Sequence, residues 1–261
     1  MVNEKELGTV IELHQRYLRG EAGGVCADLS NKLIKDVDLS GINLSRANLE
    51  EAALINVRMV KSKLNGANLR NATIFNSDFT DAYMSYANLI CAKFRGTSLA
   101  LADLSFSDMR YAVFINTDFF HADICGVNMY GSNLRSAYNV HSVKTNATTL
   151  FYNLLCPEEG SFVGWKKCKS DTIVKLLITD NAKRSSATTR KCRCSEAVVL
   201  DIQHLDGSKY ESNYTHSMSD PFFVYRIGKT VKVEDFCENR WNECSEGIHF
   251  FITRDEAVNY R

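Results

Sequence analysis

Proline is almost missing from this chain of 261 residues, and its two prolines, Pro157 and Pro221, both lie in the second half. Since proline interrupts the backbone hydrogen bonds of helices and sheets, a long stretch without it permits one continuous regular structure. No apolar run approaches the ~18 residues of a membrane-spanning helix, and the opening MVNEKELGTV is too polar for a secretory signal. We therefore expect a cytoplasmic protein that does not enter a membrane.

An excess of charge of one sign is also missing, because 31 lysines and arginines balance 31 aspartates and glutamates. This balance removes the usual overall signal of a protein that binds nucleic acid or an acidic membrane. We therefore expect a protein partner rather than nucleic acid or a membrane, and a homodimer stays open. The nine cysteines are an odd number in a chain without an export signal, which favours reduced thiols.

What the first half does contain is a repeat of five residues. From Leu29 to Leu134, every fifth position carries a large apolar residue, 22 in succession. Two positions before each of these centres the residue is mostly alanine, serine or threonine, and one position before it is often aspartate or asparagine. A period of five fits neither a helix nor a strand, whose periods are about 3.6 and 2.0. The pattern indicates a narrow coil with one large and one small inward side chain on each side.

A second and longer period indicates how many sides make one turn of the coil. One series, taken at every twentieth position, contains only aspartate and asparagine, whereas the other series at this spacing are mixed. Its members are Asp28, Asn48, Asn68, Asn88, Asp108 and Asn128. Residues at this spacing are therefore expected to stack on adjacent turns, with four sides per turn. Asp and Asn side chains bond readily to nearby backbone, as tight corners require.

Over residues 25–138 these features resemble the pentapeptide-repeat family, whose pattern is A(D/N)LXX. The resemblance implies a mainly β fold, a right-handed quadrilateral β-helix (a solenoid) of about five and a half coils. At the ~4.8 Å spacing of hydrogen-bonded strands, the coils would form a rod roughly 25 Å long. We expect this rod between an N-terminal capping helix in residues 1–24 and a separate small β-rich α/β domain in residues 139–261.

The N-terminal capping helix is predicted from residues 4–19, EKELGTVIELHQRYLR, whose apolar residues lie on one face. Asn3 with Glu6 matches a capping box, and Gly20 is a stop signal. The helix is expected to cover the unpaired backbone of the first coil, because a bare edge promotes aggregation. We interpret His14, on the apolar face, as a packed histidine rather than a ligand.

The second half has a different pattern, in which short apolar runs alternate with turn signals. Thr253 followed by Glu256 predicts the cap of a short C-terminal helix. The phrases SFVGWKKC, AKRSSATTRKCRC and CSEGIHFFITRDEAVNY resemble an uncharacterised domain found behind pentapeptide repeats in bacterial and phage proteins, which implies no activity. The runs that predict strands are Ile173–Ile178, Ala197–Ile202, Phe222–Ile227, Val231–Val233 and Ile248–Ile252.

Motifs that carry chemistry are few in this half. Four cysteines are candidate zinc ligands, but their spacing is too close in one pair and too wide in the other, so we expect ordinary thiols with no metal and no cofactor. The ending GIHFFITRDEAVNY resembles the strand–threonine–helix segment of ADP-ribosyltransferase-like folds, in which catalysis would need a partner such as Glu246 or His249. The four cysteines are Cys192, Cys194, Cys237 and Cys244.

Three groups of surface residues are candidate contact sites. Outward aromatic residues of the middle coils form a candidate partner surface or, alternatively, a seat for the second half of the chain, and they are Tyr83, Tyr86, Phe106, Tyr111 and Phe120. Aspartates of the same coils form a candidate acidic zone, and they are Asp78, Asp81, Asp103, Asp108, Asp118 and Asp123. The stretch KRSSATTRKCR is a candidate anion contact or a solvated loop, and its basic residues are Lys183, Arg184, Arg190, Lys191 and Arg193.

These observations together predict a non-enzymatic binding module, in which a rigid β-helical rod presents a surface to a macromolecular partner. An alternative, implied by the resemblance, is a DNA mimic that modulates a type II topoisomerase or another DNA-binding enzyme. The repeats carry 11 basic and 11 acidic residues, whereas a DNA mimic should be strongly negative. A second alternative is an enzyme activity in the C-terminal domain.

Overall fold

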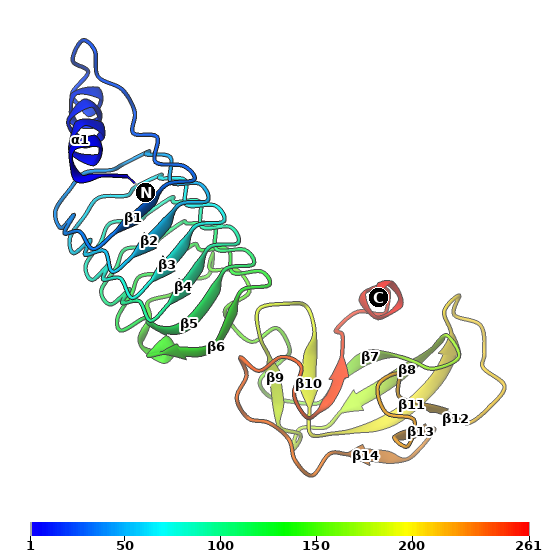
Figure 1. Cartoon of the computed structure of the whole chain (residues 1–261). Helices are drawn as coiled ribbons and strands as arrows, with labels where there is room; N and C mark the ends of the chain where they lie inside the picture. Colours follow the sequence, from blue (N-terminus) through cyan, green and yellow to red (C-terminus); the bar gives the residue numbers. More distant parts are fainter. Residues whose placement is uncertain (1, 261) are drawn as a thin grey trace. The chain divides into compact units, whose positions relative to one another are not determined.

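A computed structural model describes residues 2–260 of the chain. The chain forms two compact units, Met1–Tyr152 and Asn153–Arg261. The first unit begins with helix α1 (Glu4–Leu18), after which the chain winds into a β-solenoid of about five turns (Figure 1). Neither α1 nor any other helix within residues 2–260 has the length and apolarity that crossing a membrane requires.

One face of the solenoid is a parallel sheet of six strands, one from each successive turn. Paired residues are 20 apart, as Ile34 is from Leu54 and Ile74 is from Phe94. The other three faces show the same pairing through single bridges. The predicted stacking and the four sides per turn are thereby confirmed. The six strands are β1 (Leu33–Lys35), β2 (Ala53–Ile55), β3 (Thr73–Phe75), β4 (Lys93–Arg95), β5 (Val113–Asp118) and β6 (Asn133–Tyr138).

The core of the solenoid is filled by the large residues of the five-residue repeat. All the centres from Leu29 to Leu134 are buried, and none is more than 4% exposed. In the middle turns the Phe94 ring lies between Phe79 and Phe114, with centroids 6.4 and 5.3 Å away. Because each centre fills its space completely, a smaller or polar residue at any turn would leave a cavity or an unpaired polar group.

The corners of the solenoid explain the other positions of the repeat. From Asn31 to Gly131, the residue two after each centre has a positive φ, between 47° and 71°. Glycine, asparagine and aspartate tolerate this left-handed conformation, whereas it strains other residues. Where the residue before a centre is Asp or Asn, its side chain accepts a hydrogen bond from the N–H two residues later, as Asp28 does from Ser30 at 3.1 Å. Asn48 also donates through Nδ2 to Asp28 of the preceding turn, at 3.0 Å.

Helix α1 covers the start of the first turn. The Asn3 side chain accepts a hydrogen bond from the N–H three residues later at 2.9 Å, so Asn3 caps the helix as predicted. His14 is fully buried, and its Nδ1 accepts a hydrogen bond from the N–H of Ala27 at 3.0 Å. Gln15 donates through Nε2 to the carbonyl oxygen of Asn43 at 2.7 Å. Side chains of the helix therefore form hydrogen bonds with backbone groups that the first turn leaves unpaired. His14 is a packed histidine, as expected.

The solenoid continues past the last five-residue repeat. Asp123 pairs with Lys144, one position later than the spacing of the earlier turns predicts, and a 3₁₀ helix η1 (Val140–Ser142) lies in the lengthened turn. The first unit ends at Tyr152, whereas the sequence pattern places the boundary after residue 138. The difference arises because inserted residues destroy the register of the repeat before the coil itself ends.

The second unit holds two antiparallel sheets, a hairpin and a short helix (Figure 1). The sheets have the orders β14-β11-β8-β7 and β15-β10-β9, and β12 pairs with β13. Helix α2 (Arg254–Asn259) begins after Thr253, whose capping box with Glu256 is formed as predicted. The strands are β7 (Phe162–Cys168), β8 (Thr172–Ile178), β9 (Arg184–Ser186), β10 (Cys192–Cys194), β11 (Glu196–His204), β12 (Tyr214–His216), β13 (Val224–Arg226), β14 (Thr230–Lys232) and β15 (Ile248–Phe250).

The five predicted strands of this unit are present as β8, β11, β13, β14 and β15, with bounds that differ by a few residues. Strands β7, β9, β10 and β12 do not follow from the sequence pattern, because sequences such as RSS and CRC lack an apolar run. Strands β7, β9 and β12 pair with the strand that follows each of them in the chain, and β10 also pairs with the distant β15. An antiparallel bridge between Trp165 and Phe251 joins β7 to the end of β15.

Candidate functional site

Two aromatic rings are stacked on the outside of the solenoid. Tyr86 and Phe106 lie at the same corner of two successive turns. Their ring centroids are 5.1 Å apart, and the interplanar angle is 11°. Both are large and exposed, Tyr86 by 67% and Phe106 by 49%. Both stand at corner positions with positive φ, 59° and 57°. A bulky residue in this conformation is strained, so the pair occupies sites where glycine or asparagine would fold more easily.

The next residue of the same column is Gly126, and the Phe106 ring lies directly over it. A Cβ atom added to Gly126 would stand 2.5 Å from Cδ1 of Phe106, which is far closer than any van der Waals contact. A second ring has the same support, because a Cβ at Gly131 would stand 2.7 Å from Cδ1 of Tyr111. These glycines therefore allow each ring to lie flat along the solenoid.

The remaining aromatic candidates stand in columns other than that of the Tyr86–Phe106 pair. Tyr83 stands in another column, between Lys63 and Asp103. The rings of Tyr111 and Phe120 instead contact Tyr130 and His121, with centroids 5.6 and 4.2 Å apart. The structure thus divides the five residues among several corners and faces of the solenoid.

Sequence reasoning missed two members of the Tyr111 group. Tyr130 contacts the Phe151 ring, with centroids 5.0 Å apart, as well as the ring of Tyr111. The spacing of 20 residues gave no signal for Phe151, because in this last turn the paired residues Asn128 and Leu150 are 22 apart. Phe151 lies beyond the last recognisable repeat, where the five-residue register no longer applies.

The six aspartates of the predicted acidic zone lie in several different columns. Asp103 and Asp123 are paired neighbours in one column, while Asp108 stands in the asparagine column, where its carboxylate receives the Arg110 guanidinium at 2.7 Å. Asp78 and Asp118 share a third column with a serine between them. Asp81 stands at a corner, 3.9 Å from the ammonium of Lys61. Carboxylates so distributed do not form one continuous acidic face.

The predicted basic loop is instead the strand pair β9–β10 with its turn. Arg193 is only 2% exposed, and its guanidinium donates to the carbonyl oxygens of Cys237, Asn239 and Glu246 at 2.9 to 3.2 Å. The Arg184 guanidinium likewise donates to the carbonyl oxygen of Thr179 at 2.8 Å. These two arginines hold loops of the second unit in place, so we remove them from the candidate anion contact.

The other three basic residues of this stretch are more accessible. Lys183 forms an ion pair with Glu238, and Arg190 forms one with Glu256. Lys191 lies near a thiol, with its Nζ 3.5 Å from Sγ of Cys244, and it lines a cavity. Of these three residues, Lys191 lines the larger cavity, whereas Lys183 lines a smaller one together with Arg184, Phe236 and Glu238.

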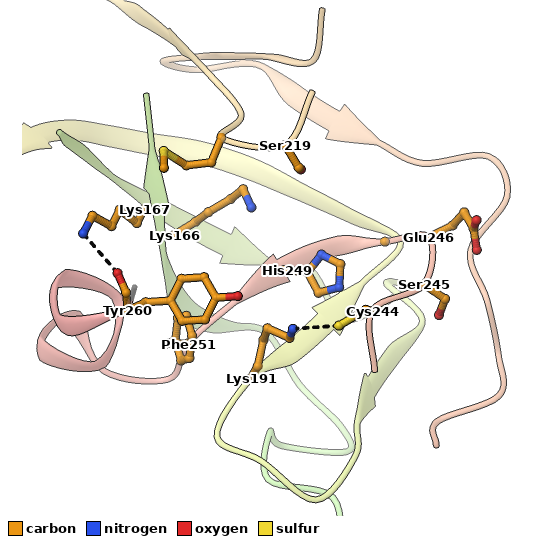
Figure 2. A pocket seen from close by; sticks show the side chains of 12 residues that line it. Lys166, Lys167, Lys191, Ser219, Cys244, Ser245, Glu246, His249, Phe251 and Tyr260 are labelled. Carbon is orange, nitrogen blue, oxygen red and sulfur yellow. Dashed lines mark hydrogen bonds between the residues drawn. The ribbon is translucent and has the colours of Figure 1, made fainter. Parts of the chain in front are cut away.

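The cavity lies in the second unit and has a volume of about 560 Å³. It is formed by β7, the turn before β10, the loop between β12 and β13, the loop before β15, β15 itself, and the segment after α2 (Figure 2). Glu246 and His249, the residues that a catalytic reading would need, both line it. The lining residues are Lys166, Lys167, Lys191, Met218, Ser219, Cys244, Ser245, Glu246, Gly247, His249, Phe251 and Tyr260.

The basic groups of this cavity have perturbed proton affinities. Burial lowers the pKa of Lys166. Burial also lowers the pKa of His249 to about 4, so its imidazole is neutral near pH 7. Nε2 of His249 lies 3.1 Å from the carbonyl oxygen of Glu243, which assigns the single proton to Nε2. Perturbed basic groups that line one cavity are typical of a ligand site.

The four cysteines weighed as zinc ligands differ in their surroundings. Cys192 and Cys194 are buried on β10, whereas Cys244 is exposed. Burial raises the pKa of the Cys194 thiol, which disfavours the thiolate that zinc requires. Within residues 2–260, no three histidine, cysteine, aspartate or glutamate side chains are grouped in a way that would hold a metal ion.

The comparisons with protein families divide the chain into the same two parts. Residues 34–71, 62–100 and 97–135 match the model of the pentapeptide repeats (8 copies). Residues 152–257 match a family of unknown function (DUF5758). The chain is thus a pentapeptide-repeat segment followed by an uncharacterised C-terminal domain. No curated protein sequence matches it.

Several solved structures are similar to the chain. The pentapeptide repeat protein alr5209 from Nostoc Pcc 7120 is 19% identical, over 54% of this chain and 95% of its own, with a TM-score of 0.34. QnrB1, a plasmid-mediated fluoroquinolone resistance protein, is 17% identical over 47% of this chain and 77% of its own, with a TM-score of 0.30. HetL from Nostoc sp. strain PCC 7120, a pentapeptide repeat protein involved in heterocyst differentiation regulation, is 20% identical over 51% and 76%, with a TM-score of 0.16. At these identities the similarity concerns the fold alone.

Proposed function

We propose that the β-solenoid is a non-enzymatic binding module that contacts a protein partner through the Tyr86–Phe106 pair. Pentapeptide-repeat folds are in general structural or binding folds rather than catalytic ones. The observation that carries the proposal is the pair itself, two exposed and stacked rings at corners where φ is positive. Their positions expose apolar area and add backbone strain, neither of which helps the solenoid to fold.

The chemistry of the pair suits a protein surface. A stacked tyrosine and phenylalanine offer a flat apolar face, and aromatic anchors of this kind dominate the binding energy of many protein interfaces. Their rigid placement reduces the conformational entropy lost on binding. The preferred partner groups are apolar side chains or an arginine that stacks on the exposed ring.

The alternative of a DNA mimic has less support. Such a protein needs a continuous acidic face, whereas its candidate carboxylates stand in several columns and at a corner. Two of them are neutralised by neighbours, since Asp108 contacts Arg110 and Asp81 lies near Lys61. The equal numbers of basic and acidic residues in the repeats also argue against a DNA mimic.

A site-specific cross-linking experiment tests the proposal. A photoreactive amino acid is placed at Lys63, an exposed position in the column next to the aromatic pair, and at Lys93 on β4 as a matched exposed control. After irradiation in an extract of the source cells, Lys63 is expected to give a discrete adduct with one protein. The same protein is expected to be lost when Tyr86→Ala and Phe106→Ala are combined.

Stability must be followed in parallel. Both side chains point outward, so the double variant should unfold within about 1 kcal/mol of the parent. An adduct at Lys63 that persists undiminished in the folded double variant contradicts the proposal. An equally strong adduct at Lys93 would show that the contact is not confined to this side of the solenoid.

A further inference from the structure

Lys166 occupies a position of β7 that faces the core of the second unit. Side chains alternate between the two faces of a strand, so Phe162, Gly164, Lys166 and Cys168 share one face. Gly164 and Cys168 are buried, and Phe162 packs against the core cluster. The same face meets Phe250 of β15, because a Cβ at Gly164 would stand 2.6 Å from that ring. A lysine therefore stands where the strand pattern calls for an apolar residue.

The ammonium of Lys166 has no acidic partner in the described part of the chain. Its charge lies over the ring of Tyr225, with Nζ 5.9 Å from the centroid. Burial lowers its pKa, which is the result expected for a positive charge withdrawn from water without a counter-ion. A core-facing lysine without a carboxylate reduces stability unless something else supplies the negative charge.

A second ammonium faces the same cavity. Lys191 approaches Cys244 and the ring of Tyr260, 6.0 Å from its centroid, and among residues 2–260 it pairs with no carboxylate. The third lysine differs, because Lys167 already donates to the carbonyl oxygens of Val258 and Tyr260 at 3.3 and 3.0 Å. Two of the three lysines are thus available to a ligand, while the third holds the segment that carries Tyr260.

The remaining walls supply an apolar surface and small polar groups. The rings of Phe251 and Tyr260 contact each other with centroids 5.1 Å apart. In Figure 2 the Tyr260 ring and the Lys166, Lys191 and His249 side chains surround one space. Ser219 and Ser245 line the same cavity and offer hydroxyl groups. The cavity therefore combines cationic groups, hydroxyl groups and aromatic faces in its lining.

We propose that this cavity binds a small phosphorylated ligand with a flat ring, of the size and chemistry of a mononucleotide. The phosphate lies between the ammonium groups of Lys166 and Lys191, and the ring lies against Tyr260 and Phe251. Phosphate suits this site because charge-assisted hydrogen bonds from ammonium groups to phosphate oxygens are strong. The volume of about 560 Å³ lies within the usual range of small-ligand cavities. Glu246, the acidic residue of the lining, is exposed.

Calorimetric titration of the full chain tests this inference with three probes. AMP carries both the phosphate and the ring, adenosine lacks the phosphate, and inorganic phosphate lacks the ring. The variants are Lys166→Met and Lys191→Met, and the control is Lys229→Met, which changes an exposed lysine outside the cavity. AMP is expected to bind more tightly than either fragment. Each cavity variant is expected to weaken AMP binding about tenfold or more, and the control to leave it unchanged.

Thermal unfolding of the same variants separates binding from folding. Methionine at position 166 places an apolar side chain on the core face, so this variant is expected to unfold at the same temperature as the parent or at a higher one. The inference is overturned if AMP fails to bind at about 10 mM, or binds no more tightly than adenosine or inorganic phosphate. It is overturned equally if folded Lys166→Met and Lys191→Met bind AMP as the parent does.

Discussion

The imidazole Nδ1 of His14 accepts a hydrogen bond from the backbone N–H of Ala27, over a distance of 3.0 Å. His14 is fully buried, and burial lowers its pKa, so the ring is neutral and keeps an unprotonated nitrogen for this bond. Ala27 belongs to the first turn of the solenoid, whose outer edge has no preceding turn to pair with. One side chain of α1 thus replaces a backbone partner that the solenoid lacks at its end.

Replacing His14 by leucine is expected to lower the free energy of unfolding of the first unit by about 1–3 kcal/mol, because the buried N–H of Ala27 loses its acceptor. Leucine retains most of the packing volume. Urea unfolding followed by circular dichroism measures the change. His141→Leu, at an exposed histidine of the same unit, serves as the control. Equal midpoints for the two variants would show that the bond does not stabilise the helix cap.

Truncation of a core centre is expected to be far more costly than truncation of an outward neighbour. Leu69→Ala should lower the free energy of unfolding by about 2–5 kcal/mol, because the closely packed column cannot collapse onto the cavity. Arg70→Ala should cost under about 0.5 kcal/mol, since its ion pair with Glu50, at 3.8 Å, is exposed. Denaturant midpoints of the two variants that agree would mean that the inward register is wrong.

A matched pair of glycine substitutions isolates the support of the aromatic rings. Gly126 and Gly41 both have φ of 71°, so alanine strains the backbone equally, by about 1 kcal/mol. Gly41 has no atom within 4 Å of an added Cβ, whereas at Gly126 the Phe106 ring is 2.5 Å away. Gly126→Ala is therefore expected to cost about 1 kcal/mol more than Gly41→Ala and to displace the Phe106 ring. NMR chemical shifts of that ring report the displacement, and unchanged shifts would contradict it.

The stability of the second unit is expected to decrease at mildly acidic pH because of His249. Its pKa is lowered by burial from 6.5 to about 4, so the unfolded chain binds this proton more readily than the folded unit. The stabilisation is therefore complete above about pH 6.5 and is lost progressively as the pH falls to about 4. The positive charges of Lys166, Lys191 and Arg193 act in the same direction.

A glutamine at position 249 separates this effect from the titration of carboxylates elsewhere. Glutamine has no proton to gain in this range and retains an N–H donor for the carbonyl oxygen of Glu243. Trp165 and Trp241 are the only tryptophans and both belong to the second unit, so their fluorescence reports its unfolding. Between pH 6.5 and 4 the parent should lose about 1 kcal/mol more per pH unit than His249→Gln. Parallel pH profiles would exclude His249 as the cause.

The solenoid follows from sequence alone because its contacts are periodic. Each turn pairs with the turn before it and the turn after it at one constant spacing, so every position of the repeat meets the same surroundings and the same residue types recur. The positions of Leu29 to Leu134, the asparagine column and the outward Tyr86 and Phe106 could therefore all be read from spacing. The helix cap at Thr253 was equally predictable, because a capping box is contained within four residues.

The tertiary structure decided which lysines line the cavity of the second unit. In the stretch SFVGWKKC, Lys166 and Lys167 look like two equivalent exposed lysines. Only the pairing of β7 with β8 and the end of β15 turns Lys166 toward the core and brings Lys167 to carbonyl oxygens at the end of α2. Arg193 shows the same limit, since its carbonyl partners lie more than forty residues away in sequence. A local sequence pattern limits which residues can be buried, but the pairing of distant strands decides which of them are buried.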